Sequence, residues 1–242
     1  PRMYATNVEA IRTWAALGIL LVAIPALMAV FVCVWDERKY YLTSLLLVGL
    51  MFVPFVLRFE GRRPQARELV VIAVLSALAV AARVVIPLPH FKAIFAVIML
   101  SGIAFGPEAG FMVGAVSALA SNFFYGQGAY TPWQMFAYGA GGMLAGFLFA
   151  KNRLPKKPVV MGVFGFLAVL LFVGPLLDTC TVFLTLPVIN AQTAWPLYVS
   201  GFPVNLSQGI CTLLTMLIFG KPLLEKLDRV KLQYGMGEDD GL

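Results

Sequence analysis

Residues 158–184 read PVVMGVFGFLAVLLFVGPLLDTCTVFL, an apolar run that contains a single charged residue, Asp178. A helix that crosses the hydrocarbon core of a bilayer needs about 20 mostly apolar residues, so this run predicts a membrane-spanning helix. Similar runs follow one another along the chain, separated by short polar or Gly/Pro breaks. The predicted spans are residues 11–35, 41–58, 68–87, 92–106, 109–125, 133–150, 158–184 and 198–220.

The composition agrees with a membrane protein. Hydrophobic residues make up 60% of the chain and charged residues only 12%, whereas a soluble domain has about 25% charged residues. An outer-membrane barrel would show alternating segments of about 10 residues, so helices are the expected spanning structure. The formal net charge of +6 is better explained by basic residues beside an anionic leaflet than by a nucleic-acid partner. We therefore expect an all-α membrane protein whose surroundings are the lipid bilayer.

The distribution of basic residues predicts the orientation of the chain. If both termini are cytoplasmic, the inner segments hold 14 of the 18 Lys and Arg residues and the outer segments hold three, with Arg83 inside a span. This distribution agrees with the positive-inside rule. The sequence thus predicts a multi-pass protein of the cell membrane with both termini in the cytoplasm.

The chain divides at its most polar internal break, residues 58–67. We interpret residues 1–67 as a two-helix N-terminal extension and residues 68–220 as a six-helix core. Residues 221–242 begin with basic and apolar residues at helical spacing, which predicts an amphipathic segment on the inner membrane surface. The acidic, Gly-rich end of this region is expected to be disordered.

The sequence shows no catalytic machinery. Paired carboxylates, a metal cluster or a nucleophile with a base would be needed for chemistry, and none is visible. His90 is the single histidine, the three cysteines lack CxxC spacing, and no P-loop occurs. We expect no enzyme, no cofactor and no metal, so any ATP hydrolysis must take place in another subunit.

Small residues recur every four positions in several spans, a spacing that lets helices approach closely. They are Ala73, Ala77 and Ala81, then Gly102, Gly106, Gly110 and Gly114, and finally Gly142 and Gly146. Internal packing within one chain is the simpler interpretation of such stripes. The spacing alone does not favour a docking surface for another protein.

Polar residues inside the spans are more informative, because a charge in the hydrocarbon costs several kcal/mol and usually faces a cavity or a partner. The predicted outer half contains Arg83, Asn122, Gln134, Asp178, Asn205 and Gln208. A convergent polar pocket that opens outward is the functional interpretation. A structural ion pair between Arg83 and Asp178, with scattered interhelical hydrogen bonds, is the alternative.

The two outer connections favour the pocket. Residues 87–92 read PLPHFK, and residues 122–134 read NFFYGQGAYTPWQ. Aromatic residues at this depth often form an interfacial belt, but a belt needs no Gly-Gln-Gly hinge, whereas a loop closing over a flat ligand would use both rings and hinge. The candidate substrate-binding residues are Arg83, His90, Phe91, Lys92, Asn122, Tyr125, Gln127, Tyr130, Trp133, Gln134, Asp178 and Asn205.

The stretch from Ala66 to about Gly146 resembles the substrate-binding S components of energy-coupling factor (ECF) transporters. The resemblance is carried by the alanine stripe, the Pro-Leu-Pro loop, the turn GIAFGPEAG at 102–110, and SNFFYGQGAYTPWQMF at 121–136. The last block is the most specific of these motifs. Six core helices also fit the family, whereas the two N-terminal helices depart from its minimal pattern.

The resemblance implies that the chain binds a vitamin from outside and docks on a membrane coupling subunit, which forms the ECF module with two ATPases. It assigns the docking face to Ala73, Ala77 and Ala81. The aromatic loop and the chain size look most like the cobalamin-specific branch, and another vitamin or a queuosine precursor is the alternative substrate.

A self-sufficient secondary transporter is a further alternative. It would show inverted repeats and midplane acidic residues, but the sequence offers only Asp178, near an edge.

Overall fold

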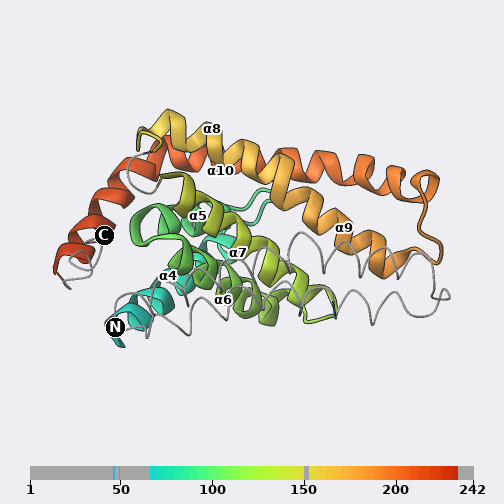
Figure 1. Ribbon diagram of the computed structural model, residues 1–242, viewed down its shortest axis with the longest axis horizontal. Coiled ribbons are helices and arrows are strands. Elements are labelled where there is room, and N and C mark those ends of the chain that lie inside the picture. The colour runs from blue at the N-terminus through green and yellow to red at the C-terminus, as the bar shows by residue number, and fades with distance from the viewer. Residues whose placement is uncertain (1–45, 47–48, 50–65, 150–152, 234–242) are drawn as a thin grey trace, which may run out of the picture.

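The structure is a computed structural model that describes residues 66–149 and 153–233, together with Leu46 and Gly49 (Figure 1). The elements are α4 (Ala66–Val84), α5 (Ile94–Phe105), α6 (Pro107–Tyr125), α7 (Tyr130–Phe149), α8 (Pro158–Ala168), the π-helical η4 (Val169–Val173), α9 (Gly174–Thr185) and α10 (Ala191–Gln233). Because α8, η4 and α9 form one continuous helix, the described ranges contain six helices, which agree with the six predicted core spans. Apart from Leu46 and Gly49, the two predicted N-terminal helices lie outside the described residues, as does the acidic tail.

Helix α5 is the centre of the bundle. Every residue from Ile94 to Ala104 is buried, as expected for a helix that is apolar on all sides. It packs against α4, α6, α7 and α10. With 12 residues, α5 is only about 18 Å long. The connection that precedes it, residues 85–93, therefore lies partway along α10 (Figure 1), and most of its residues from Val85 to His90 are exposed.

Glycines bring α5, α6 and α7 into backbone contact. A Cβ atom on Gly102 of α5 would overlap the carbonyl oxygen of Gly142 of α7, and a Cβ on Gly142 would overlap the carbonyl oxygen of Gly110 of α6. Only glycine permits this approach at all three positions. The glycine stripes thus serve internal packing, as the simpler interpretation predicted.

Two helices in the described ranges are long and apolar enough to cross a membrane by length and composition, Pro158–Thr185 with 28 residues and Ala191–Gln233 with 43. The first contains the π turn η4, where the Gly174 N–H donates to the Val169 carbonyl. Pro175 follows this turn and has no N–H to donate. A π turn of this kind widens a helix locally and is often found near functional sites.

Helix α10 is longer than predicted at both ends. It begins at Ala191 and continues to Gln233, whereas the predicted span covers residues 198–220. The basic segment predicted to lie on the inner membrane surface is the end of α10, which turns aside near its end (Figure 1). Its place at a membrane surface stays a prediction. Leu224 and Leu227 of this segment are buried in the core, because its apolar side packs against the bundle.

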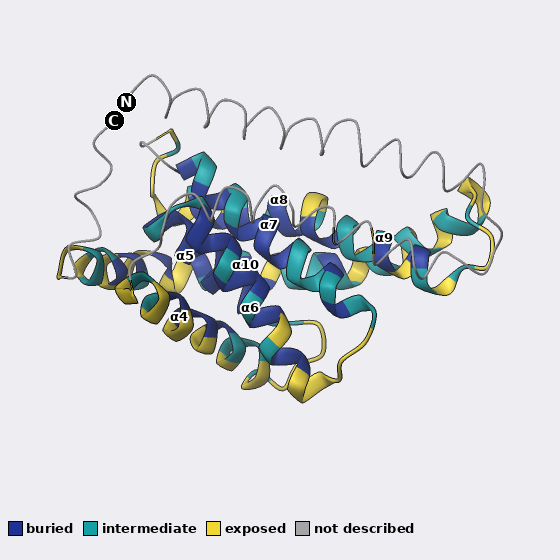
Figure 2. Ribbon diagram, turned by 60° about the horizontal axis from the view of Figure 1, so that its bottom comes forward, coloured by how far each residue is buried: buried dark blue, intermediate teal, exposed yellow. Residues whose placement is uncertain are grey.

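Helix α4 lies along one edge of the molecule (Figure 2). Its inner side, with Ile72, Leu75 and Ala79, is buried. The predicted stripe of Ala73, Ala77 and Ala81 is exposed on the opposite side, together with Val70 and Val74. Unlike the glycine stripes, the alanine stripe does not serve packing within the described part of the chain.

Candidate substrate-binding site

A network of polar side chains joins α4, α6 and α7. Arg83, in the last turn of α4, donates from Nη1 to Ser121 Oγ and, at 3.0 Å, to Asn122 Oδ1. The buried Asn122 amide donates onward to Gln134 Oε1 at 2.8 Å and to Thr131 Oγ1 at 3.2 Å. Three of the predicted site residues, far apart in sequence, are therefore in one hydrogen-bonded cluster.

Two tyrosine rings flank Arg83. Its guanidinium carbon lies 4.8 Å from the ring centroid of Tyr125 and 5.7 Å from that of Tyr138, within the range of cation–π interactions. The Tyr125 hydroxyl donates to the backbone carbonyl of Arg83 at 3.1 Å. Lys92 Nζ lies 5.9 Å from the same Tyr125 ring, so both cations share one aromatic neighbour.

The connection between α4 and α5 positions Lys92. Pro87 and Pro89 stiffen it, and His90 adopts a φ of 57°, a left-handed conformation uncommon for residues other than glycine. Lys92 Nζ donates back to the carbonyl of Ile86. This bond holds the ammonium group near the end of α4. Phe91, also a predicted site residue, is half-buried.

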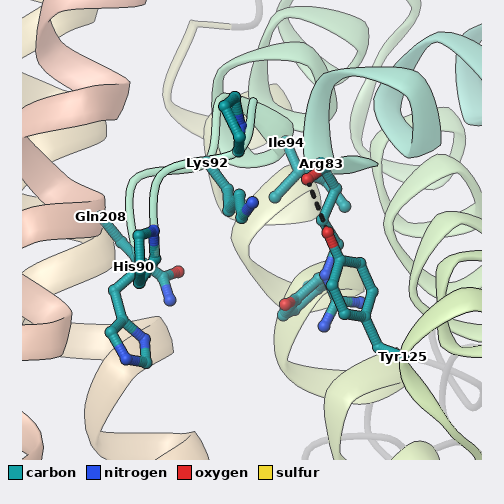
Figure 3. A pocket seen from close by; sticks show the side chains of 9 residues that line it. Arg83, His90, Lys92, Ile94, Tyr125 and Gln208 are labelled. Carbon is teal, nitrogen blue, oxygen red and sulfur yellow. Dashed lines mark hydrogen bonds between the residues drawn. The ribbon is translucent and has the colours of Figure 1, made fainter. Parts of the chain in front are cut away.

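These elements enclose a cavity of about 400 Å³ (Figure 3). Its polar and aromatic lining consists of Arg83, His90, Lys92, Tyr125, Tyr138 and Gln208, and two loop prolines and Ile94 complete it. The volume is at the lower end of the range for small-molecule sites, roughly 300–1,000 Å³. In this view Lys92 lies between His90 and Gln208 on one side and Arg83 and Tyr125 on the other. Four predicted site residues, Arg83, His90, Lys92 and Tyr125, thus line one cavity.

The connection between α6 and α7 bonds mostly to itself. Gln127 donates to the Leu119 carbonyl at 3.0 Å and accepts from Thr131 Oγ1 at 2.9 Å. The Tyr130 hydroxyl donates to the Gly126 carbonyl at 2.6 Å, where the backbone has a φ of 101° that favours glycine. Neither Gln127 nor Tyr130 lines the cavity, so their predicted role in closing over a ligand stays a prediction.

Trp133 lies in the core. Because α7 already begins at Tyr130, Trp133 falls in its first turn, and only 2% of it is exposed. Its ring stacks on Phe183 of α9 with centroids 6.0 Å apart. The structure thus does not bring Trp133 to the cavity with the other predicted residues.

Asp178 and Asn205 form a separate pair between α9 and α10. The Asn205 amide donates to Asp178 Oδ2 at 2.7 Å. The alternative ion pair between Arg83 and Asp178 does not occur among the described residues, because the side-chain partners of Arg83 are neutral and Asp178 is bonded to Asn205. Neither member of the pair lines the cavity.

One lining residue, Tyr138, is absent from the sequence predictions, and Gln208 is predicted as a polar residue of the pocket but is not among the candidate binding residues. Tyr138 follows Gln134 by four residues and Gln208 follows Asn205 by three, and such spacings share a helix face. Extending each candidate binding residue by one helical turn would add both.

The arrangement suits the binding of a small molecule. Within residues 66–149 and 153–233, no group of three or more His, Cys, Asp or Glu side chains is placed to hold a metal ion. Apolar helices around a compact, polar-lined cavity define a membrane-embedded binding protein. A family model described as "ECF-type riboflavin transporter, S component" matches residues 64–227, which are 164 of the 242 residues, and the chain belongs to this family. No curated protein and no solved structure matches it.

Membership in this family makes the chain the substrate-binding S component of an ECF transporter, an integral membrane protein and not an enzyme. This confirms the resemblance noted from the sequence and the expectation of a non-enzymatic subunit. It also implies a vitamin substrate and an energizing ECF module as partners. The finer expectation of cobalamin is not supported, because the family is named for riboflavin.

Proposed function

We propose that the chain captures a small vitamin in the cavity beside Arg83 and delivers it to an ECF module. The observation that carries the proposal is the convergence of Arg83, Lys92, Tyr125 and Tyr138, from three helices and a loop, on one cavity in an S component. The tyrosine rings offer faces for a flat ligand, and the two cations offer hydrogen bonds.

A vitamin of flavin size, such as riboflavin or a derivative of it, fits this proposal better than cobalamin does. The family is named for riboflavin, and a cavity of about 400 Å³ is smaller than a corrin ring with its nucleotide tail. We therefore adopt the alternative that the substrate is a vitamin other than cobalamin.

The exposed side of α4, with Ala73, Ala77 and Ala81, is the proposed docking face for the coupling subunit. Its small side chains would let a partner helix approach closely.

The proposed orientation has both termini in the cytoplasm. Its support is that α4 begins, α8 begins and α10 ends at the end of the bundle opposite the α9–α10 connection (Figure 1). These helix ends carry Arg67, Lys157 and Lys226.

Reconstitution tests this function. Proteoliposomes that contain the chain and an ECF module should take up labelled riboflavin only when ATP is supplied to the ATPases, and liposomes with the chain alone should show no uptake. Uptake by the chain alone would contradict the proposal and favour a self-sufficient secondary transporter.

A further inference from the structure

The basic residues of the described chain fall into two groups. Eight of the ten lie in the first turn of α4, just before α8 or in the last part of α10, and these segments lie at one end of the bundle (Figure 1). They are Arg67, Arg153, Lys156, Lys157, Lys221, Lys226, Arg229 and Lys231. The positive-inside rule accounts for that group. The other two, Arg83 and Lys92, both line the cavity, and that rule does not explain them.

No described carboxylate balances these two charges. The lining contains no acidic residue, and Asp178 is bonded to Asn205. Among the described residues, Arg83 donates only to the neutral Ser121 and Asn122, through Nη1. A guanidinium has five N–H donors, so Nη2 and Nε keep theirs for another acceptor. Lys92 likewise uses one of its three hydrogens on the Ile86 carbonyl.

Two cations inside an apolar bundle are costly unless something compensates them. The tyrosine rings supply part of the compensation, because Tyr125 lies within cation–π range of both. The amino end of α5 also reaches the cavity at Ile94 and has no side-chain cap, so its partial positive charge adds to the local potential. The whole environment favours a negatively charged occupant.

We propose that the ligand of this cavity carries an anionic oxygen group, a carboxylate or a phosphate, which binds between Arg83 and Lys92. This inference rests on the proposed function and narrows its substrate class. Riboflavin itself is uncharged, so the inference predicts that its phosphate ester, or another vitamin with a carboxylate, binds more tightly than an uncharged counterpart.

Titration calorimetry with matched ligand pairs tests the inference on the purified full-length chain. The pairs are riboflavin and flavin mononucleotide, nicotinamide and nicotinate, and biotin amide and biotin, which differ mainly in one anionic group. For the pair that binds, the anionic member should have at least about tenfold higher affinity, the size expected for a charged hydrogen bond. Which pair binds shows whether the anionic group is a phosphate, as in flavin mononucleotide, or a carboxylate, as in nicotinate and biotin.

Matched variants assign the preference to the cavity. Lys92→Gln should reduce the preference for the anionic member to within about threefold, because a glutamine cannot supply the charge. Lys157→Gln, an exposed lysine at the basic end, should leave it unchanged. An equal loss in both variants would overturn the assignment to the cavity.

The outcomes also separate this inference from the proposed function. If the uncharged member binds as tightly as the anionic one, the inference is overturned and the proposed function stands. If no pair binds, the co-purifying small molecule is identified by mass spectrometry. A carboxylate or phosphate compound supports the inference, and its absence overturns it. Failure of the chain to assemble with any ECF module would overturn the proposed function instead.

Discussion

The side-chain amide of Asn205 donates a 2.7 Å hydrogen bond to Asp178 across the α9–α10 contact, and each residue packs over a glycine of the opposite helix. A Cβ on Gly174 of α9 would overlap Asn205, and a Cβ on Gly201 of α10 would overlap the Asp178 carboxylate. The two polar side chains are thus fixed by reciprocal packing. This arrangement favours a packing role for the pair over ligand binding.

Substitutions at Asp178 test that role. Asp178→Asn keeps an acceptor for Asn205 and should change the melting temperature little, whereas Asp178→Ala leaves a buried amide unpaired and should cost about 1–3 kcal/mol. Thermal unfolding in detergent measures both. Ligand affinity of Asp178→Asn should stay within about twofold of the wild type, a difference of less than 0.5 kcal/mol. A larger loss would mean that Asp178 binds the ligand after all.

The contact of α5, α6 and α7 predicts that Gly142→Ala is destabilising. The new methyl group would overlap the backbone of Gly110, and overpacking of this kind costs about 1–3 kcal/mol. Gly220→Ala is the matched control, because its nearest neighbour is the flexible end of Met161 at 3.3 Å. It should stabilise α10 by up to about 1 kcal/mol through helix propensity. Equal melting temperatures for the two variants would contradict the close contact.

The exposed side of α4 predicts that docking on the ECF module can be blocked without loss of ligand binding. Ala77→Trp should prevent co-purification with the ECF module, because a large side chain on the docking face blocks the approach of a partner helix. Ligand affinity should not change, since Ala77 is exposed on the side away from the core. Val163→Trp, at a 47% exposed residue of α8, should retain the module. Full recovery of the module with Ala77→Trp would rule out this face.

The burial of Trp133 predicts that its substitution lowers the stability of the protein, rather than acting first on closure of the loop over a ligand. Trp133→Ala should cost about 3–5 kcal/mol. Trp133→Phe should cost much less, because it keeps a ring to stack on Phe183 and removes a buried indole N–H that has no hydrogen-bond partner in the described residues. Trp195→Ala, at a 69% exposed residue, is the control and should be within about 0.5 kcal/mol of the wild type. Unchanged stability of Trp133→Ala with weakened ligand binding would restore its predicted gating role.

Spacing in the sequence was enough to predict the six core helices and the close glycine contacts. A continuous apolar run fixes a helix such as α5, and GxxxG spacing at Gly142 and Gly146 requires a close neighbour whatever its identity. The gathering of Arg83, Asn122 and Gln134 was also predictable, because buried polar groups need partners. These features follow from local pattern and from general costs of burial.

Side-chain pairings across helices were not predictable. Asp178 could have paired with Arg83 or with Asn205, and only the rotation of α10 relative to α9 decides between them. Trp133 falls both in the predicted connection 122–134 and at the start of the predicted span 133–150, because the aromatic block continues into α7 (Tyr130–Phe149) without a break in composition. The exposed side of α4 depends on where the bundle covers it, which the regular Ala73, Ala77 and Ala81 spacing does not indicate.

Native mass spectrometry of the chain, released from detergent with its co-purified ligand, tests the central claim most directly. We predict one bound small molecule per wild-type chain, retained in the exposed control Arg153→Gln and lost in Arg83→Gln, because Arg83 lies between the two tyrosine rings at the cavity. A bound molecule retained at full occupancy in Arg83→Gln would contradict the account.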